Sequence, residues 1–360
     1  MGWLICLSQL VCLMFFLHSQ LTSSSSFTSC STLLCSQEQS SALLQFKQQL
    51  SYPTSSFSNC PNDSYPKIES WKESIDFCSW DGVKCDKTRR YVIGLDLSSS
   101  GLQGTNPSNS SLFLLPHLQQ LNLAFNNFSL SQISSGFGQF ARLKYLNLSY
   151  SQCLGQVPLE LSNLSNLVSL DLSGNNIGLK NFVLMSLVQN LSKLRELHLD
   201  HVNMSLVLLD SLMNLSSSLT SLTLNGCELH GTLPYNIFRL PNLHVLSLVS
   251  NPELTGFFPM TNWSNPLMFL DVSTTRFSGA LPNSIGNLKF LEHLGLCQCN
   301  FSGLVLASLG NLTQITFLDL SNNNFGGELP SSLSNLKALS YLTLQSNMFS
   351  GKIPSLLESG

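Results

Sequence analysis

The sequence predicts an α/β solenoid, in which short units stack side by side and share one continuous core. Three observations support this prediction. Leucines recur at a nearly constant spacing from residue 91 onward, pairs of leucines flank a single polar residue, and a small polar residue often follows three places later. An alternation of period two places both leucines on one side of a strand. Self-similarity at a fixed period of about 20–50 residues is typical of solenoids.

The middle leucine of each unit defines the repeat. These marker leucines are Leu95, Leu121, Leu146, Leu170, Leu197, Leu222, Leu246, Leu270, Leu294, Leu318 and Leu342. Successive markers are 24 to 27 residues apart, and the last five steps are all 24 residues. Residues 91–360 are therefore predicted to form eleven leucine-rich repeats of about 24 residues, whose short strands make a parallel sheet.

The residue three places after the last leucine of each unit is predicted to turn inward. Asparagine holds this place at Asn126, Asn175, Asn251, Asn323 and Asn347. Its amide can bond backbone groups that the turn leaves unpaired. Smaller polar or thiol side chains hold it at Ser100, Ser151, Cys227, Thr275 and Cys299. Val202 cannot make such bonds, so its unit is predicted to interrupt this ladder.

The amino-terminal residues predict export. Trp3–Leu17 is an apolar run, and small and polar residues follow it up to Ser26. This order is typical of a secretory signal peptide, here expected over residues 1–26. Eleven cysteines fit an oxidising compartment. The net charge of −3 supplies no basic field, so no nucleic-acid partner is expected.

Two further patterns resemble plant leucine-rich-repeat receptors. Several units continue with glycine, two residues and proline, as in Gly279–Pro282 and Gly327–Pro330. This pattern is similar to the plant-specific repeat class, and the resemblance implies a second short sheet. It also implies a right-handed superhelix that carries the main parallel sheet on its concave face. Residues 27–90, with the segment CSWDGVKC at Cys78–Cys85, are similar to the helical, disulfide-bonded N-terminal cap of this family.

The insert around Tyr65–Pro66 and the phrases at 194–200 and 238–243 resemble the Cf-type receptor-like proteins of disease resistance. The resemblance implies a disulfide between Cys78 and Cys85. The family has adjacent cysteines where this chain has Phe77 and Cys78, so Cys35 is left with Cys30, with Cys60 or with no partner. Family members continue beyond the position of Gly360, so the chain is expected to lack a C-terminal cap and to be a fragment or truncated product.

Within the cap, Ser36 and Gln39 have capping-box spacing. This spacing predicts a helix that begins at Ser36. Leu43, Leu44, Phe46 and Leu50 would lie on its apolar side.

Outward-facing side chains of the predicted sheet are the candidate ligand contacts. They are Tyr145, Glu196, His198, Asp200, Phe269, His293, Phe317 and Tyr341. The cluster of Glu196, His198, Asp200 and His201 could titrate together, but a solvated patch is the favoured interpretation. His293, Cys297 and Cys299 lack a fourth zinc ligand. Neither a metal site nor a cofactor is expected.

Eleven N-x-S/T sequons predict glycans that would keep a weakly charged surface wet. They stand at Asn62, Asn109, Asn127, Asn147, Asn163, Asn190, Asn203, Asn214, Asn262, Asn300 and Asn311. Several of them also match the consensus of the repeat, so a purely structural role is the alternative. A glycan on Asn147 would cover part of the concave face.

The sequence contains none of the common catalytic motifs, so no enzyme is expected. The favoured hypothesis is an extracellular ligand-recognition module of a plant receptor-like protein in pathogen perception and defence signalling. Its expected ligand is a peptide, protein or glycan, and the resemblance implies receptor-kinase co-receptors. The full-length family stands at the extracellular face of the plasma membrane, whereas this chain as given would be secreted. The alternatives are a secreted polygalacturonase inhibitor and an ectodomain fragment of a leucine-rich-repeat receptor kinase.

Overall fold

The computed structural model describes residues 32–51, 65–104, 110–128, 131–261, 263 and 265–352. The expected signal peptide lies outside these residues, as do Cys30, Cys60, Asn62, Asn109 and Asn262, and so does the side chain of Cys35. The chain divides into two compact units, 1–38 and 39–360. Of the first unit, only residues 32–38 are described, and they form the beginning of helix α2 (Thr32–Gln48).

Helix α2 begins before Ser36, so the prediction that a capping box starts the helix there is wrong. Gln39 instead lies inside the helix, where its buried side chain serves a tertiary contact. Its Oε1 atom accepts a hydrogen bond of 2.7 Å from the backbone N–H of Val92, the first residue of strand β2. Leu43 and Phe46 are buried on the same side of the helix, as their spacing predicts.

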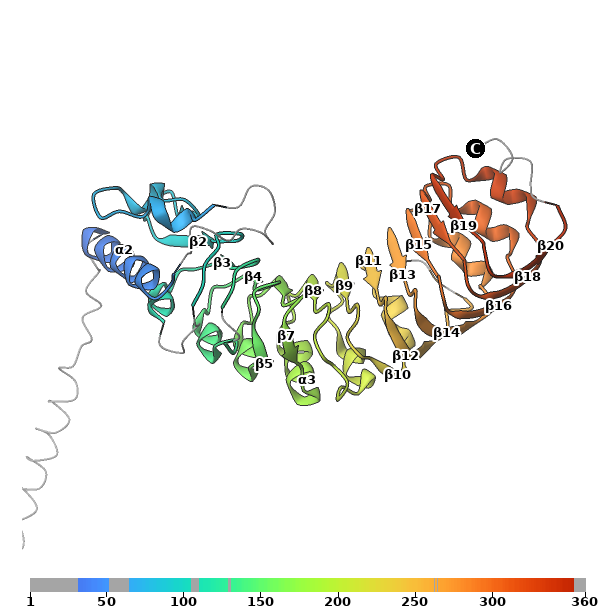
Figure 1. Ribbon diagram of the computed structural model, residues 1–360, viewed down its shortest axis with the longest axis horizontal. Coiled ribbons are helices and arrows are strands. Elements are labelled where there is room, and N and C mark those ends of the chain that lie inside the picture. The colour runs from blue at the N-terminus through green and yellow to red at the C-terminus, as the bar shows by residue number, and fades with distance from the viewer. Residues whose placement is uncertain are drawn as a thin grey trace, which may run out of the picture. The chain divides into compact units, whose positions relative to one another are not determined.

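The main sheet contains twelve strands among the described residues, in chain order apart from the strands that belong elsewhere (Figure 1). Its strands are β1 (Val83–Cys85), β2 (Val92–Asp96), β3 (Gln120–Asn122), β4 (Tyr145–Asn147), β6 (Ser169–Asp171), β8 (Glu196–His198), β9 (Ser221–Thr223), β11 (Val245–Ser247), β13 (Phe269–Asp271), β15 (His293–Gly295), β17 (Phe317–Asp319) and β19 (Tyr341–Thr343). Strand β1 is antiparallel to β2, and all the other pairs are parallel. The predicted repeat solenoid is confirmed.

The register of the main sheet aligns the marker leucines. Leu95 pairs with Leu121, Leu246 with Leu270, and Leu318 with Leu342, and the pairs between them follow the same rule. Every residue on one strand therefore lies beside its counterpart about 24 residues away. Side chains that share a repeat position form rows across the sheet.

The strands of a second sheet lead into the Gly-x-x-Pro segments, as the resemblance to the plant class implies, although the unit with Gly303 lacks the proline. It contains β10 (His230–Thr232), β12 (Asn251–Gly256), β14 (Thr275–Gly279), β16 (Asn300–Leu304), β18 (Asn324–Glu328) and β20 (Met348–Ser350). A separate pair is formed by β5 (Leu154–Gln156) and β7 (Asn176–Gly178). Between them, the unit that contains Val202 has no Gly-x-x-Pro segment and contributes only an isolated bridge from Asn203 to Gly178.

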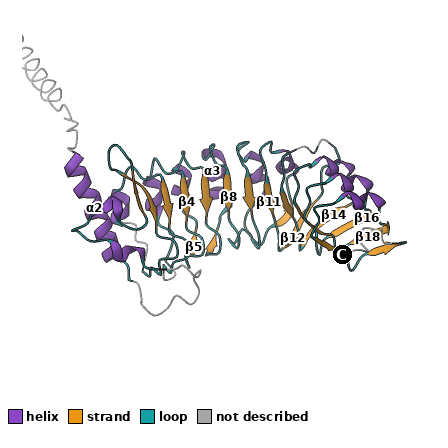
Figure 2. Cartoon of the chain, turned by 90° about the horizontal axis from the view of Figure 1, so that it is seen from above, coloured by secondary structure: helices purple, strands orange, loops and turns teal. Residues whose placement is uncertain are grey.

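Short helices complete each coil. Helix α3 (Asn181–Asn190) is the only α-helix among the described repeat residues, and the others are 3₁₀ turns. The turns of the repeats are η3 (Ser111–Leu114), η4 (Ser135–Gln139), η5 (Leu159–Asn163), η6 (Leu209–Asn214), η7 (Tyr235–Arg239), η8 (Asn283–Asn287), η9 (Ala307–Asn311) and η10 (Ser331–Asn335). The cap contains two more, η1 (Lys67–Ser70) and η2 (Phe77–Ser79). Figure 2 shows the helices of the repeats along one edge of the main sheet and the second sheet along the other. No helix in the described part of the chain is both long and apolar enough to cross a membrane.

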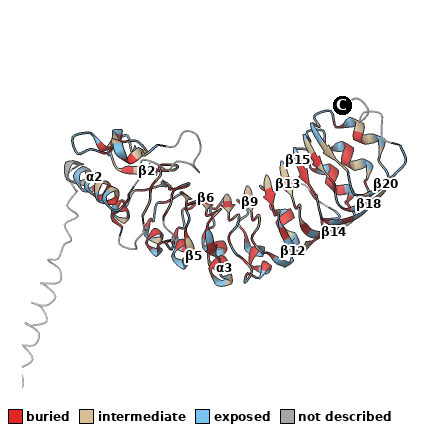
Figure 3. Cartoon of the chain, viewed as in Figure 1, coloured by how far each residue is buried: buried red, intermediate tan, exposed pale blue. Residues whose placement is uncertain are grey.

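The core runs through the middle of the stack as one continuous cluster of buried leucines and aromatic residues (Figure 3). Along one side of this core, the asparagine ladder forms hydrogen bonds with backbone groups of the turns. Asn175 accepts hydrogen bonds from the N–H groups of Ser151 and Cys153, and its Nδ2 donates to the carbonyl groups of Leu148 and Leu172. Val202 is fully buried and adds no side-chain hydrogen bond, which is the interruption that the sequence predicts.

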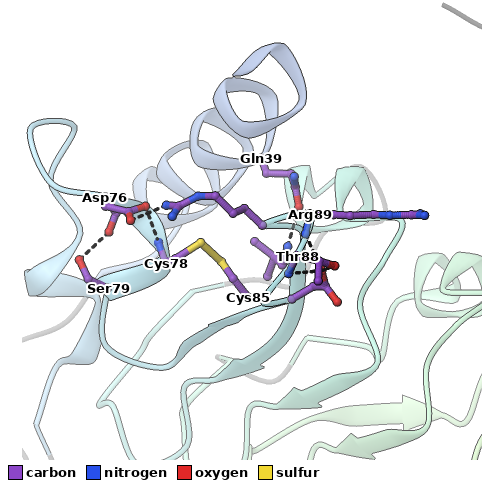
Figure 4. The surroundings of a disulfide bond; sticks show 10 residues. Gln39, Asp76, Cys78, Ser79, Cys85, Thr88 and Arg89 are labelled. Carbon is purple, nitrogen blue, oxygen red and sulfur yellow. Dashed lines mark hydrogen bonds and ion pairs between the residues drawn. A yellow bond between two sulfur atoms is a disulfide. The ribbon is translucent and has the colours of Figure 1, made fainter. Parts of the chain in front are cut away.

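Within the cap, the disulfide Cys78–Cys85 links η2 to β1, as the family resemblance implies (Figure 4). Next to it, Asp76 pairs with Arg90 and accepts a hydrogen bond from the N–H of Cys78. The pair lowers the pKa of Asp76. In the same cap, the buried rings of Trp71 and Trp80 stack on each other with their centres 5.5 Å apart.

Candidate functional site

Four of the candidate ligand residues form one row on the solvent face of the main sheet. Phe269, His293, Phe317 and Tyr341 hold the same position on β13, β15, β17 and β19, and we call them the ring row. Their ring centres are 4.0, 4.2 and 4.4 Å apart, with planes within 14° of parallel. Because each ring covers the faces of its neighbours, the row presents mainly ring edges to solvent.

The neighbouring position contributes a carboxylate that fixes the histidine of the ring row. Asp271 follows the marker leucine of β13, and its Oδ2 atom lies 3.0 Å from Nε2 of His293. Gly295 makes this contact possible, because a Cβ atom there would lie 2.3 Å from Oδ2 of Asp271. The oxygen Oδ1 of Asp271 also accepts the N–H of Ser273, so the carboxylate is held from two sides. Asp271 is not among the candidate residues that the sequence indicates, because an aspartate recurs at this place in several units and does not stand out.

The charged cluster at β8 does not form a compact site. Glu196 and His198 alternate with buried Leu197 and are half-buried on the solvent face, where Nε2 of His198 lies 2.9 Å from the hydroxyl of Ser221. Asp200 instead ties two repeats together, because it accepts hydrogen bonds from the hydroxyl of Thr223 and the N–H of Asn225. Among the described residues, no three His, Cys, Asp or Glu side chains could together hold a metal ion.

Tyr145 lies apart from the ring row, near the amino-terminal end of the main sheet. It lines a hollow of about 490 Å³ over β2, β3 and β4, together with Lys84, Asp96 and Asn147. Lys67 forms an ion pair of 3.2 Å with Asp96. The structure thus divides the predicted site residues into three places on one face: this hollow, the β8 cluster and the ring row.

The cysteines near the ring row serve the core and not a zinc site. The buried thiol of Cys299 lies 3.1 Å from the carbonyl oxygen of Val272 and donates to it. Cys297 is half-buried and accepts a hydrogen bond from the hydroxyl of Ser321. Burial raises the pKa of Cys153 to about 11 and that of Cys227 to about 12, and it also raises the pKa of Cys299.

Most of the described sequon asparagines are exposed. Asn163, Asn190, Asn214 and Asn311 end short helices, Asn300 is the first residue of β16, and Asn203 makes the isolated bridge to Gly178. Asn127 and Asn147 are half-buried. The side chain of Asn147 accepts hydrogen bonds from the N–H and the hydroxyl of Ser149 while it lines the hollow near Tyr145.

The repeats in the structure agree with the protein families that the sequence matches. The chain matches the leucine rich repeat N-terminal domain over residues 36–86 and the leucine rich repeat over residues 166–191 and 314–336. The chain therefore belongs to the leucine-rich repeat proteins.

Its relatives are plant receptor-like proteins of the Cf-9 type, not enzymes, which confirms the resemblance that the sequence indicates. It is 42% identical over 276 residues to receptor-like protein 6 of Arabidopsis thaliana, covering 73% of this chain and 28% of that protein. It is 41% identical over 270 residues to receptor-like protein Cf-9 of Solanum pimpinellifolium, covering 72% of this chain and 31% of that protein. The chain thus spans less than a third of the length of either relative.

Among solved structures, the fold is similar to that in the crystal structure of PEPR1–AtPEP1. The TM-score is 0.64 with 27% sequence identity, over 88% of this chain and 46% of that chain.

Proposed function

We propose that this chain is the ligand-recognition part of an extracellular receptor-like protein and that it binds a peptide across the solvent face of the main sheet, without catalysis. The observation that carries the proposal is the ring row. Aromatic side chains there stand on adjacent rigid strands, and Tyr341 is 45% exposed. Exposed aromatic groups on a rigid scaffold lose little conformational entropy on binding and are enriched at the centres of interfaces.

The form of the ring row favours an extended chain as the ligand. Its exposed ring edges make a narrow apolar strip across four strands, about 14 Å long at the usual strand spacing. Asp271 adds a fixed carboxylate beside this strip, positioned to accept hydrogen bonds or pair with a cation. The similarity to the PEPR1–AtPEP1 structure supports the same class of ligand.

A selection experiment tests the proposal. The full chain, produced in plant cells, is used to select binders from a displayed library of random peptides. The double variant Phe317→Ala and Tyr341→Ser is expected to bind the selected peptides at least tenfold more weakly, because it removes two of the four rings, including the exposed ring of Tyr341. A matched control is Phe290→Ser, which removes an aromatic side chain that is 63% exposed but lies outside the row.

Equal binding by the double variant, at unchanged melting temperature, would show that the ring row is not the recognition surface. Failure to select any peptide from the library, while a displayed folded protein or an oligosaccharide binds to the same face, would exclude the peptide class.

The proposal also covers the secretion of the chain, its glycans and its co-receptors. We infer that residues 1–26 direct secretion and that exposed sequons carry glycans. A glycan on Asn147 would occupy the hollow near Tyr145, and so would leave the ring row as the open part of the face. Receptor-kinase co-receptors are inferred from the family resemblance, and their binding is tested by co-purification with the ligand-loaded chain.

A further inference from the structure

A second hollow lies away from the ring row, at the edge of the main sheet where helical turns lead into the first strands. Its volume is about 280 Å³, and we call it the edge hollow. Its lining includes the side chains of Arg89, Tyr91, His117, Gln119 and Arg142. Arg89 extends away from the nearby disulfide in Figure 4. Most of the lining is polar, and its two apolar residues, Tyr91 and Ile93, are half-buried, so it has no exposed aromatic anchor of the kind that centres a protein interface.

The edge hollow has an excess of positive charge. Two guanidinium groups, Arg89 and Arg142, face one carboxylate, Asp86, whose Oδ1 already accepts hydrogen bonds from the N–H of Arg89 and from Thr88. Neither arginine forms an ion pair with another described residue. Two cations held close together without a partner repel each other, so an anion between them would be stabilised.

The positive charges of these two arginines affect the titration of His117. Its pKa is lowered by burial first and then by the charges of Arg142 and Arg89, which Asp86 only partly offsets. Its ring stacks on Tyr91 with centres 4.0 Å apart, and Nδ1 is enclosed without a hydrogen-bond partner in the described structure. An enclosed acceptor costs less than an enclosed donor, which favours the neutral ring with its proton on Nε2. The neutral ring can thus donate one hydrogen bond from Nε2.

The positive charge continues along the edge. The backbone N–H of Lys144 donates to Gln119, and the next strands follow in register through Val168 to Arg195. In the adjoining row, Nζ of Lys193 donates to the side chain of Asn166. Lys144, Lys193 and Arg195 are all exposed, so cations recur over about 19 Å from β2 to β8 at the usual strand spacing. A linear ligand with regularly spaced anions fits such a row better than one isolated anion does.

Among the described residues, no sequon ends a helical turn beside the edge hollow. Helical turns η5 and α3, beside the far half of the row, end at the sequon residues Asn163 and Asn190. The turns next to the hollow, η3 and η4, end at Leu114 and Gln139.

We propose that the edge hollow binds an acidic oligosaccharide, with a uronate carboxylate between Arg89 and Arg142 and the next sugars toward Lys144. The polar part of the lining supplies hydrogen bonds to sugar hydroxyl groups, whereas a protein partner would require exposed apolar anchors, and Tyr91 and Ile93 are half-buried. This site lies on a different surface from the ring row and does not depend on the proposed peptide binding.

Calorimetric titration of the full chain with a de-esterified oligogalacturonate of about ten sugars tests the proposal. Binding is expected to weaken severalfold between 50 and 200 mM salt, because the contacts are ionic. Arg89→Gln and Arg142→Gln are each expected to weaken binding about tenfold. Lys289→Gln and Lys337→Gln, exposed cations beside later helical turns, are the matched controls and should leave binding unchanged.

A spectroscopic measurement separates a direct contact from a structural effect. The bound carboxylate would offset the field of the arginines, so the pKa of His117, followed by NMR, is expected to rise when the oligogalacturonate binds. The two arginine variants should keep the melting temperature of the parent chain, because both side chains lie at the surface.

Equal binding of the fully methyl-esterified oligomer would overturn the proposal, and so would wild-type affinity in both arginine variants. Polyglutamate that binds as tightly as the uronate would assign the site to acidic peptides instead. Because peptide selection on the ring row is independent of Arg142, the R142Q variant distinguishes failure of this site from failure of the proposed receptor function.

Discussion

At the scale of single residues, a ladder side chain supports with hydrogen bonds the turn that follows each strand, except in the unit of Val202. The residue before each ladder position has a positive φ in all eleven units, yet only Gly174 and Gly226 among them are glycines. Thr274 adopts φ of 58°, a conformation that a β-branched residue takes only at a cost. The ladder side chain offsets this cost, because its hydrogen bonds hold the turn in place.

Asn175→Ala tests this role. The substitution leaves the buried N–H groups of Ser151 and Cys153 and several carbonyl groups without partners, so the free energy of unfolding should fall by on the order of 3 kcal/mol. Chemical denaturation of the purified chain measures it. Asn335→Ala, at an exposed position, is the control and should change stability by less than about 0.5 kcal/mol. A loss no larger than that of the control would show that the ladder bonds are dispensable.

The free thiols should differ in reactivity. At pH 8 a thiol with a pKa of about 12, such as Cys227, is ionised only to about 10⁻⁴. Alkylation of the native chain, mapped by peptide mass spectrometry, should therefore modify half-buried Cys297 well before Cys153 or Cys227. The raised pKa values also stabilise the fold below pH 9, and this contribution is lost as pH rises through 9 toward 12. Modification of Cys227 as fast as Cys297 would contradict the packing described.

At the scale of elements, neighbouring helical turns approach each other closely enough to require glycine. In η9, a Cβ atom on Gly310 would lie 2.3 Å from the carbonyl oxygen of Ser332 in η10. Gly138 and Gly286 make the same kind of approach, to Glu160 and Ser308. These contacts set the spacing of the coils on the helical side, while the strands set it on the other.

Gly310→Ala is expected to destabilise the chain by about 1–3 kcal/mol, since the turns must move apart to admit the methyl group. Thermal unfolding followed by circular dichroism measures the change. Gly326→Ala is the matched control, because the nearest atom would lie 3.6 Å away, which is an ordinary contact. Equal melting temperatures for the two variants would mean that the turns are free to separate.

At the scale of the whole molecule, the surface carries few charges. Only 10% of the residues are charged, against about 25% in a typical soluble domain. Exposed apolar side chains such as Phe182, Leu206 and Met260 add to this surface. Glycans on the exposed sequons would supply the missing hydration.

Tryptic mass spectrometry after enzymatic deglycosylation is expected to find Asn163, Asn190, Asn214 and Asn311 occupied. Preventing glycosylation during expression should shift the chain from monomer to aggregate in size-exclusion chromatography. A chain that stays monomeric without any glycan would show that its polar uncharged residues keep it soluble on their own.

Much of the fold follows from the sequence because the repeat is local. The period and the alternation determine which side chains face the core, so the leucine rows, the asparagine ladder and its interruption at Val202 were all predictable. The column that contains the ring row was predictable for the same reason, as was the second sheet from the family resemblance.

Contacts between side chains of different repeats became known only from the tertiary structure. The Asp271–His293 pair requires Gly295, which lies beside Asp271 at the same position of the next strand. The edge hollow joins Arg89 of the cap to Arg142 of a later repeat. Gln39 bonds Val92 within the tertiary structure instead of capping its own helix. Such contacts depend on the register in which coils about 24 residues apart are laid side by side, and no local pattern of one coil contains that register.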